Sequence, residues 1–471
     1  MASPAMTLEA VILAAGEGTR MRSALPKSLH QIGGAPMLAH ILKAAGALNP
    51  AKIHLVVARR GGDLVKDAVE RGLAARRAEE LLGKICWATQ ESSLGTGHAV
   101  MQAMPAVGRE STLLVLYGDT PLLRASTLAR LAAVKDGVAL LTAELENPDG
   151  FGRIVRGAGG EIERIIEHKD ADAAQKKIRE CNAGCMAAPA KVIAEALGGI
   201  RPDNAQRELY LTDVVAAAAA AGARITACHP DAIEETIGVN TQTDLACAER
   251  VFQLGQAREV MARGLCLRDP ARFDLRGRFE FGRDCALDIN VILEGEISLG
   301  ARCRIGANSV IRNSSIGDDS VIEANCVLDG AVVGANCVIG PFARLRPRAQ
   351  LADGARAGNF VEIKNSRVGR GAKANHLSYI GDSEIGAGAN IGAGVITCNY
   401  DGANKHRSVI GEDVFVGSNS ALVAPLRIGD GATIGAGSTI TQDVAAADLA
   451  VGRARQRAVR GWKRPVKKTG Q

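Results

Sequence analysis

Hydrophobic and polar positions follow two different rhythms along the 471 residues. From residue 8 to about 240, short aliphatic runs such as EAVILAA and STLLVLYGD alternate with stretches of helical spacing such as PMLAHILKAAGAL. This alternation predicts a largely parallel sheet with helices on both faces. Residues 243–264 place apolar side chains at helical spacing, which predicts one connecting helix.

After that helix the period changes to six. Aliphatic residues recur at this interval as far as Ile440, beginning with Leu287, Leu293, Leu299, Ile305 and Ile311. Glycine often follows them, as in Ile305-Gly306 and Ile316-Gly317. A six-residue period with glycine in the turns is typical of a hexapeptide β-helix, in which three short strands make one triangular coil. Stacked coils bury together what one coil cannot bury alone.

The segment CNYDGANKHRSV, residues 398–409, interrupts the repeat and predicts a projecting loop. The predicted organisation is therefore an α/β, Rossmann-like domain over 1–242, a linker helix over 243–264 and a parallel β-helix over 265–471.

Composition agrees with an aliphatic interior. The chain has 54 Gly but only 2 Trp, 4 Tyr and 8 Phe, while 47% of residues are hydrophobic. That hydrophobicity excludes intrinsic disorder. The 15 prolines and the absence of a Gly-X-Y period exclude a collagen-like chain.

The net charge of +6 is concentrated at one end, because the tail 451–471 holds eight basic residues and no acidic one. Such a tail binds a phosphate-bearing ligand, is simply solvated, or binds nucleic acid or anionic lipid. No second basic stripe or aromatic platform supports nucleic acid, so we expect no nucleic-acid partner.

The eleven cysteines are scattered without a Cys-x-x-Cys pair, and the longest apolar run, VVAAAAAAGA, is too short to span a membrane. The N-terminus lacks the features of a signal peptide. These features predict a reduced, cytoplasmic protein without a membrane partner.

A glycine-rich loop directly follows the first predicted strand, with Gly16 and Gly18 in the segment Leu13–Met21. Backbone N–H groups in such a loop form an anion-binding nest. The cations Arg20 and Lys27 stand close enough in sequence to reach a triphosphate. The alternative is an ordinary strand-to-loop turn with solvated cations.

Here the sequence resembles a known superfamily, the sugar-nucleotide pyrophosphorylases. The matching motifs are LAAGxGTRM with LPK, Gln90, LGTGHA at 94–99, YGD at 117–119, FGR at 151–153, EHK at 167–169, NAG at 182–184 and GVN at 238–240. With the hexapeptide half, the likeness covers nearly the whole chain. It is to the bifunctional enzymes that join N-acetylglucosamine-1-phosphate uridylyltransferase to glucosamine-1-phosphate N-acetyltransferase, and it implies a left-handed β-helix.

The resemblance implies roles for the residues of the first half. Asp119 and Asn240 would hold Mg²⁺, for which oxygen ligands are suitable. Arg20 and Lys27 would stabilise charge on the transferring group. Gln90, Gly95 and Thr96 would read the uracil, and Gly152, Glu167 and Asn182 would bind the amino sugar. The full set implied for UTP and UDP-N-acetylglucosamine is Leu13, Ala14, Ala15, Gly16, Gly18, Lys27, Gln90, Gly95, Thr96, Tyr117, Gly118, Asp119, Gly152, Glu167, Asn182 and Asn240.

In the second half, polar residues cluster where the repeat is least regular. Acetyl transfer to an amine needs a proton acceptor, and a histidine near its ordinary pKa of about 6.5 can serve. His376 is the expected general base, with Glu362 as a further candidate to orient it or the amine. By the resemblance, glucosamine 1-phosphate contacts Arg346, Lys364, Tyr379 and Asn390. Acetyl-CoA contacts Ala393, Asn399, Tyr400, Ser418, Ala436 and Arg453.

The expected function is a two-step synthesis of UDP-N-acetylglucosamine that supplies bacterial peptidoglycan and lipid A. Acetyl-CoA and glucosamine 1-phosphate react first, and UMP transfer from UTP follows with release of pyrophosphate. Because hexapeptide acetyltransferases bind CoA between subunits, the resemblance implies a homotrimer. Of the four tyrosines, we expect only Tyr210 to be purely structural.

Two other functions share this domain order. One is a single-activity nucleotidyltransferase whose β-helix serves only assembly, as in ADP-glucose pyrophosphorylase. The set of His376, Tyr379 and NYDGAN argues against it. The other is a non-catalytic exchange-factor subunit, which would be expected to lose the phosphate loop and the Tyr-Gly-Asp motif that are intact here.

Overall fold

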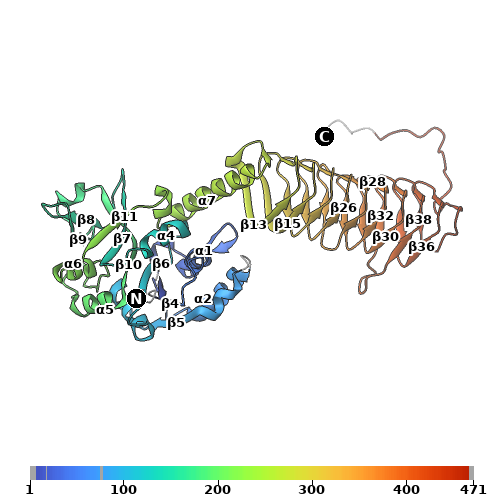
Figure 1. Cartoon of the computed structure of the whole chain (residues 1–471). Helices are drawn as coiled ribbons and strands as arrows, with labels where there is room; N and C mark the ends of the chain where they lie inside the picture. Colours follow the sequence, from blue (N-terminus) through green and yellow to red (C-terminus); the bar gives the residue numbers. More distant parts are fainter. Residues whose placement is uncertain (1–6, 17, 75–77, 466–471) are drawn as a thin grey trace, which may run out of the picture. The chain divides into compact units, whose positions relative to one another are not determined.

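A computed structural model describes residues 7–16, 18–74 and 78–465. The chain divides into two compact units (Figure 1). The first comprises Met1–Glu259 with Asp274–Arg278, and the second comprises Val260–Phe273 with Phe279–Gln471. Residues 466–471 of the basic tail lie outside the described residues.

The first unit is built on one twisted sheet. Its strand order is β11 (Ile225–Cys228), β7 (Val138–Glu144), β10 (Glu180–Pro189), β6 (Thr112–Tyr117), β1 (Leu8–Ala14), β4 (Lys52–Ala58) and β5 (Ile85–Gln90). A hairpin of β8 (Arg153–Arg156) and β9 (Ile162–Ile166) extends from β10. A separate small ribbon pairs β2 (Gln31–Ile32) with β3 (Ala35–Pro36).

The sheet is largely parallel, as the alternation predicted, but β10 runs antiparallel to both β6 and β7. A parallel neighbour requires a long crossover, usually through a helix. Between β7 and β10 the chain instead makes the β8–β9 hairpin, and no described α-helix lies between β7 and β10. The chain therefore re-enters the sheet as an antiparallel strand without a crossover helix.

Helices cover both faces of the sheet. Alternate residues of β1 point to opposite sides, with Ala10 and Ile12 in one core and Val11 and Leu13 in the other. The first core includes residues of α1 (Met37–Gly46), α2 (Gly62–Ala74) and α4 (Ala125–Ala132). The second includes residues of α3 (Thr96–Ala103), α5 (Ala190–Gly199) and α6 (Asp213–Ala220).

The region predicted as a connecting helix is α7, Gln242–Ala262. It buries Ala248, Ala257 and Val260, whereas Met261 is 42% exposed. No described helix is both long and apolar enough to cross a lipid bilayer.

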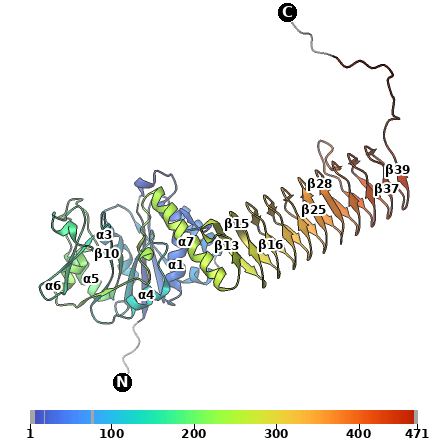
Figure 2. The same ribbon diagram turned by 90° about the horizontal axis from the view of Figure 1, so that it is seen from above.

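The second unit is a coil of short parallel strands arranged in three faces (Figure 2). The first face contains β12 (Cys266–Leu267), β14 (Ala286–Leu287), β16 (Arg304–Ile305), β19 (Val321–Ile322), β22 (Val338–Ile339), β25 (Arg356–Asn359), β28 (Lys373–His376), β31 (Asn390–Ile391), β34 (Phe415–Val416), β37 (Thr433–Ile434) and β39 (Leu449–Ala450).

The other two faces start from β13 (Phe273–Phe281) and the long β15 (Val291–Leu299). The second face continues through β17 (Val310–Arg312), β20 (Val327–Asp329), β23 (Arg344–Leu345), β26 (Glu362–Lys364), β29 (Tyr379–Gly381), β32 (Ile396–Cys398), β35 (Ala421–Val423) and β38 (Thr439–Ile440). The third contains β18 (Ser315–Ile316), β21 (Val332–Val333), β24 (Gln350–Leu351), β27 (Arg367–Val368), β30 (Ser383–Ile385), β33 (Ser408–Ile410) and β36 (Leu426–Ile428).

Most strands pair with the strand one coil later, 17 or 18 residues on, as in Val310 with Val327 and Arg344 with Glu362. The aliphatic residues of the six-residue period are buried, from Leu287 to Ile440. The pairings of β30 with β33, β31 with β34 and β32 with β35 span more residues, as in Ile396 with Ala421. The extra residues form the predicted loop between Cys398 and Ser408, which leaves the coil (Figure 1).

The glycines that follow the aliphatic residues of the repeat serve a different structural purpose from the one predicted. We expected glycine to make the turns, but the left-handed turn residues include Asn308 and Asn325, with φ of 60° and 62°. A Cβ on Gly306 would instead lie 2.5 Å from the backbone nitrogen of Ala324 in the next coil. The glycine that follows the aliphatic residue therefore permits close stacking of coils.

Candidate active sites

The glycine-rich loop after β1 brings Lys27 close to the end of the sheet. Gly18 has φ of 62°, and a Cβ there would lie 2.7 Å from the Cβ of Lys27. Glycine adopts this backbone conformation at little cost. Gly18 thus supports the position of Lys27, while Gly16 has open space above it.

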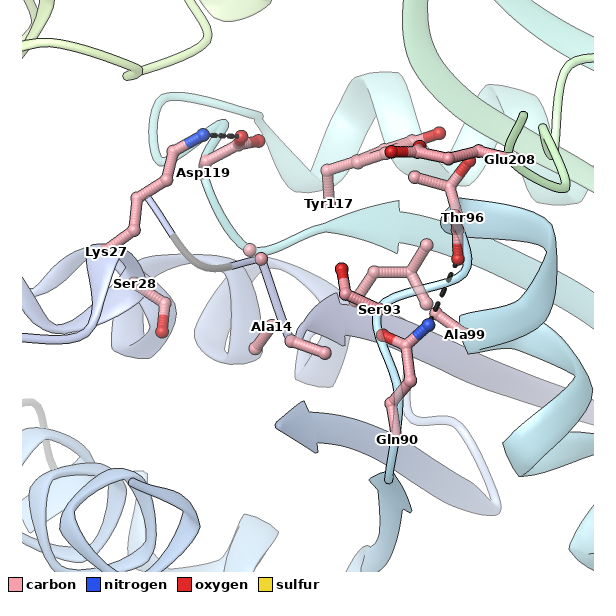
Figure 3. Close-up of a pocket in the computed structure, with 15 residues that line it drawn as sticks. Ala14, Lys27, Ser28, Gln90, Ser93, Thr96, Ala99, Tyr117, Asp119 and Glu208 are labelled. Carbon is pink, nitrogen blue, oxygen red and sulfur yellow. Dashed lines mark hydrogen bonds and ion pairs between the residues drawn. The ribbon is translucent and has the colours of Figure 1, made fainter. Parts of the chain in front are cut away.

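Lys27 lies between the two residues expected to bind metal. Its Nζ donates to Asp119 Oδ2 at 2.5 Å and to Asn240 Oδ1 at 2.7 Å. Arg20 Nη2 donates to the same Asn240 oxygen at 2.9 Å. The structure therefore brings together two cations and two oxygen ligands from four separate segments, and the Lys27–Asp119 pair is visible in Figure 3.

A cavity of about 270 Å³ opens beside this cluster. Lys27 and Asp119 meet at one end, and Thr96, Glu208 and Gln90 lie toward the other (Figure 3). The residues that line it are Leu13, Ala14, Ala15, Gly16, Lys27, Ser28, Gln90, Ser93, Gly95, Thr96, Ala99, Tyr117, Gly118, Asp119 and Glu208. Of the five loop residues implied for UTP, Leu13, Ala14, Ala15 and Gly16 line this cavity and Gly18 does not.

A second cavity of about 680 Å³ contains the residues predicted to bind the sugar. Gly152, Glu167 and Asn182 line it, together with Arg20 and Asn240. The two cavities share Thr96, Tyr117, Asp119 and Glu208 as a common wall. A reacting phosphate placed at Asp119 would therefore be reached from both sides.

Contacts within the chain hold the Gln90 amide in place. The side chain is 7% exposed. Its Nε2 donates to Gly95 O at 3.1 Å and lies 3.0 Å from His98 Nδ1. An amide held on two sides presents a fixed pattern to a planar ring.

Glu167 accepts from Thr212 Oγ1 at 2.9 Å in the second cavity. Burial raises the pKa of its carboxyl, and the nearby Asp170 and Asp213 add to the rise, whereas the Thr212 hydroxyl lowers it. Burial likewise raises the pKa of the Tyr117 phenol.

Tyr210, expected to be purely structural, lines the second cavity although it is only 8% exposed. Burial raises its pKa to about 12, so it stays a neutral donor. Neighbouring Glu208 lines both cavities and was missed by sequence reasoning. Leu209 N donates to Leu94 O and Leu209 O accepts from Gly97, both at 2.8 Å. Glu208 was missed because this pairing is made by the backbone and leaves no pattern in the amino-acid sequence.

In the second unit, His376 ends β28 on the first face of the coil. Its Nδ1 lies 2.5 Å from Asn359 Oδ1, its register partner one coil earlier. The imidazole is exposed. Asn359 was not singled out in the sequence, because only the coil spacing relates it to His376.

Cations gather on the neighbouring second face. Arg346 Nη1 donates to Glu362 Oε1 at 2.9 Å, and Tyr379 pairs with Glu362 in register. The pKa of Lys364 is lowered, chiefly by its contact with Lys405 of the projecting loop and then by burial. Two ammonium groups in contact favour an anion between them. Lys405 is a further residue that no motif identified.

The remaining predicted contacts lie apart in this one chain. Asn390 belongs to β31 on the first face, away from Arg346, Lys364 and Tyr379 on or beside the second. Asn399 and Tyr400 directly follow the second-face strand β32, at the start of the projecting loop. Asn399 is buried, and its amide donates to Asp382 Oδ2 at 2.5 Å.

Four of the predicted CoA contacts form one column along a corner of the coil. Ala393, Ser418 and Ala436 occupy equivalent positions in successive coils, because Asn419 N donates to Ala393 O and Gly437 N donates to Ser418 O, both at 2.8 Å. Arg453 continues the column, and its Nη1 donates to Ala436 O at 2.6 Å. His376 is the last residue of β28 on the first face and lies one coil before Ala393. We call Ala393, Ser418, Ala436 and Arg453 the corner column.

Comparison with known proteins gives matches over both units. The description MobA-like NTP transferase domain fits residues 10–180. Bacterial transferase hexapeptide (six repeats) fits 313–347 and 407–442, and hexapeptide repeat of succinyl-transferase fits 296–329. A putative glucose-1-phosphate thymidylyltransferase from Bacillus anthracis matches with a TM-score of 0.42 and 19% identity, covering 52% of this chain and 95% of that one.

Two relatives match nearly end to end. Bifunctional protein GlmU of Stutzerimonas stutzeri is 53% identical over 465 residues, covering 98% of this chain and 100% of the relative. Bifunctional protein GlmU of Pseudomonas putida is 52% identical over 464 residues, covering 98% and 99%. The layered α/β unit is thus a nucleotidyltransferase domain, and the coil is a left-handed β-helix of hexapeptide repeats. The chain belongs to the family of bifunctional GlmU proteins, transferases that join a uridylyltransferase to an acetyltransferase.

Proposed function

We propose that the chain carries out both reactions of its family through the residues described above. The first unit transfers UMP from UTP to N-acetylglucosamine 1-phosphate and releases pyrophosphate. The observation that carries this assignment is the wall shared by the two cavities, where Asp119 accepts from Lys27 of the first cavity, and Lys27 also donates to Asn240 of the second. One cavity takes the nucleotide and the other takes the sugar.

Lys27 and Arg20 act as the catalytic cations. Phosphoryl-type transfer needs positioning and charge neutralisation more than covalent chemistry. Both side chains contact Asn240, so both are directed to the point where the α-phosphate must sit. Displacing Lys27 from Asp119 frees its ammonium for the phosphate.

The donor set also fits Mg²⁺. Asp119 and Asn240 offer one carboxylate and one amide oxygen, which already coordinate a cation in the form of the Lys27 ammonium. Mg²⁺ prefers one or two protein oxygens together with phosphates and water. When bound there it would neutralise phosphate charge.

Substrate selection follows from the two cavities. Gln90, Gly95 and Thr96 bind the base, and the loop residues Leu13, Ala14, Ala15 and Gly16 lie along the phosphates. Gly152, Glu167 and Asn182 bind the sugar and its amide. A Cβ on Gly152 would meet Ile165 Cγ2 at 2.8 Å, so only glycine allows this approach beside Glu167.

The second unit transfers the acetyl group from acetyl-CoA to glucosamine 1-phosphate. His376 is the general base. An amide oxygen can only accept, so the bond to Asn359 places the proton on Nδ1 and leaves Nε2 to receive the proton of the amine. Arg346, Lys364 and Lys405 bind the sugar phosphate, and Tyr379 borders it.

Acetyl-CoA lies along the corner column, with Ala393, Ser418 and Ala436 against its arm and Arg453 at its phosphates. A homotrimer is supported by the division of the site, because Asn390, Asn399 and Tyr400 lie away from the residues they would serve within one chain. A neighbouring copy would bring them together.

The functional boundaries we propose are 1–242 for uridylyl transfer, 243–264 for the connection and 265–471 for acetyl transfer. The partners are small substrates available in the cytoplasm. Free thiols suit that compartment, and all eleven cysteines are unpaired.

One assay tests both assignments. Glucosamine 1-phosphate, acetyl-CoA, UTP and Mg²⁺ are supplied, and free CoA and pyrophosphate are measured together. His376→Ala should abolish CoA release and leave uridylyl transfer from pre-acetylated sugar intact, and Asp119→Ala should do the reverse. Loss of both activities in a folded variant would contradict independent sites.

A further inference from the structure

One corner position of the β-helix changes character near His376. In nine successive coils the residue here adopts a left-handed conformation, with φ between 49° and 75°. Along the chain the position is occupied by Asn290, Asn308, Asn325, Phe342, Phe360, Leu377, Gly394, Asn419 and Gly437. Asparagine and glycine adopt this conformation readily, but large apolar residues rarely do.

Three successive coils therefore hold Phe342, Phe360 and Leu377 in a backbone conformation that is unfavourable for large side chains. They gain little burial in return, because they are 50%, 56% and 61% exposed in the chain. Phe342 and Phe360 stack with their ring centroids 5.2 Å apart. A strained, exposed apolar residue that folding does not require points to a role in function.

The place of the change supplies that role. Leu377 directly follows His376, and its N–H donates to Asn359 O at 3.0 Å. Its backbone is therefore bound to the same asparagine whose side chain contacts the imidazole. In the following coils the position is Gly394, Asn419 and Gly437, beside Ala393, Ser418 and Ala436 of the corner column. Small and polar residues thus accompany the proposed path of CoA, and bulky apolar residues begin at the base.

We propose that Leu377, supported by Phe360, is the wall that limits the length of the acyl group. The proposal rests on the assignment of the corner column to an acyl-CoA thioester. The thioester arm lies against Ala393 and the small residues beyond it, and its acyl carbons reach His376. There the Leu377 side chain leaves room for two carbons and excludes longer chains, so the residue determines acyl specificity.

The test compares acyl donors in Leu377→Gly and in a matched control. Glycine removes the side chain and fits the left-handed backbone, so the variant should fold. Phe342→Gly makes the same kind of change two coils away from His376. CoA release is measured with acetyl-CoA and with butyryl-CoA, using glucosamine 1-phosphate as acceptor. We expect Leu377→Gly to raise the butyryl-to-acetyl ratio of kcat/KM at least about 10-fold, as for two methylene groups in a pocket. Phe342→Gly should leave the ratio unchanged.

Each other result overturns the proposal. An unchanged ratio in a Leu377→Gly variant that still uses acetyl-CoA would show that Leu377 does not contact the acyl group. An unchanged ratio with a smaller assembly by light scattering would assign the residue to a subunit contact instead. A wild-type enzyme that released no CoA from either donor, or a fully active His376→Ala variant, would contradict the proposed function itself.

Discussion

His376 Nδ1 and Asn359 Oδ1 lie 2.5 Å apart across two adjacent coils, each held in register by the strands that carry it. Since the amide fixes the ring, Asn359→Ala should lower kcat for acetyl transfer by roughly 10-fold, and His376→Ala by roughly 100-fold or more. Steady-state CoA release measures both. Asn359→Ala should leave the KM for acetyl-CoA unchanged, and an increased KM with normal kcat would contradict an orienting role.

Lys27 contacts both proposed metal ligands, so its removal should affect uridylyl transfer alone. Lys27→Met should lower kcat for pyrophosphate release by about 100- to 1000-fold, the usual effect of losing one charge-stabilising donor. CoA release serves as the internal control in the same preparation. Equal loss of both products would indicate a folding defect rather than a catalytic one.

Glu167 has a pKa raised chiefly by burial. A carboxyl whose pKa is higher in the folded state favours folding while it is protonated, and this contribution is lost as pH rises through the folded pKa. Glu167→Gln should therefore have a higher Tm than wild type at neutral pH, with the difference shrinking as pH falls toward 4. The same variant should bind N-acetylglucosamine 1-phosphate more weakly. A Tm difference that grew in acid would be the opposite of this expectation.

Lys364 and Lys405 repel each other when the substrate is absent, as the lowered pKa of Lys364 indicates. Lys405→Met should therefore raise the KM for glucosamine 1-phosphate several-fold while leaving Tm equal or higher. The increase should diminish at high salt, because added ions screen the attraction for phosphate. Arg427→Met, on β36, provides a control outside this group.

Coil stacking limits substitution at Gly306 more than turn conformation does. A Cβ there would meet the next coil, whereas Gly371 has φ of 66° and open space. Asparagine tolerates a left-handed backbone but not the close contact. Gly306→Asn should lose about 1–3 kcal/mol of unfolding free energy, as overpacking does. Gly371→Asn should be nearly neutral, and equal losses in denaturant melts would refute the distinction.

The sequence predicted best what depends on local spacing. The six-residue period identified the buried aliphatic residues of all three faces, from Leu287 to Ile440. The motifs around Lys27 and Asp119 were recognisable because catalysis requires those residue types near the ends of strands.

Residues recruited by backbone pairing or by coil register were not predictable. Glu208 reaches both cavities only because Leu209 pairs with residues 94 and 97. Asn359 and Lys405 become relevant only when one coil is placed against the next. Tyr210 is largely shielded from solvent, yet it lines a cavity. The periodicity of the sequence does not distinguish such a residue from an ordinary core residue.

The corner column also sets a fixed distance along the coil. Strands in a sheet lie about 4.8 Å apart, so the four coil steps from His376 to Arg453 set a span of roughly 19 Å. That distance is fixed by the backbone and cannot be adjusted by side chains. Inserting one whole coil between Ala393 and Ser418 would preserve every turn and core contact of the repeat, yet it would lengthen the span by one strand spacing. A thioester anchored at Arg453 would then fall short of the base, and a well-folded enzyme would stop acetylating.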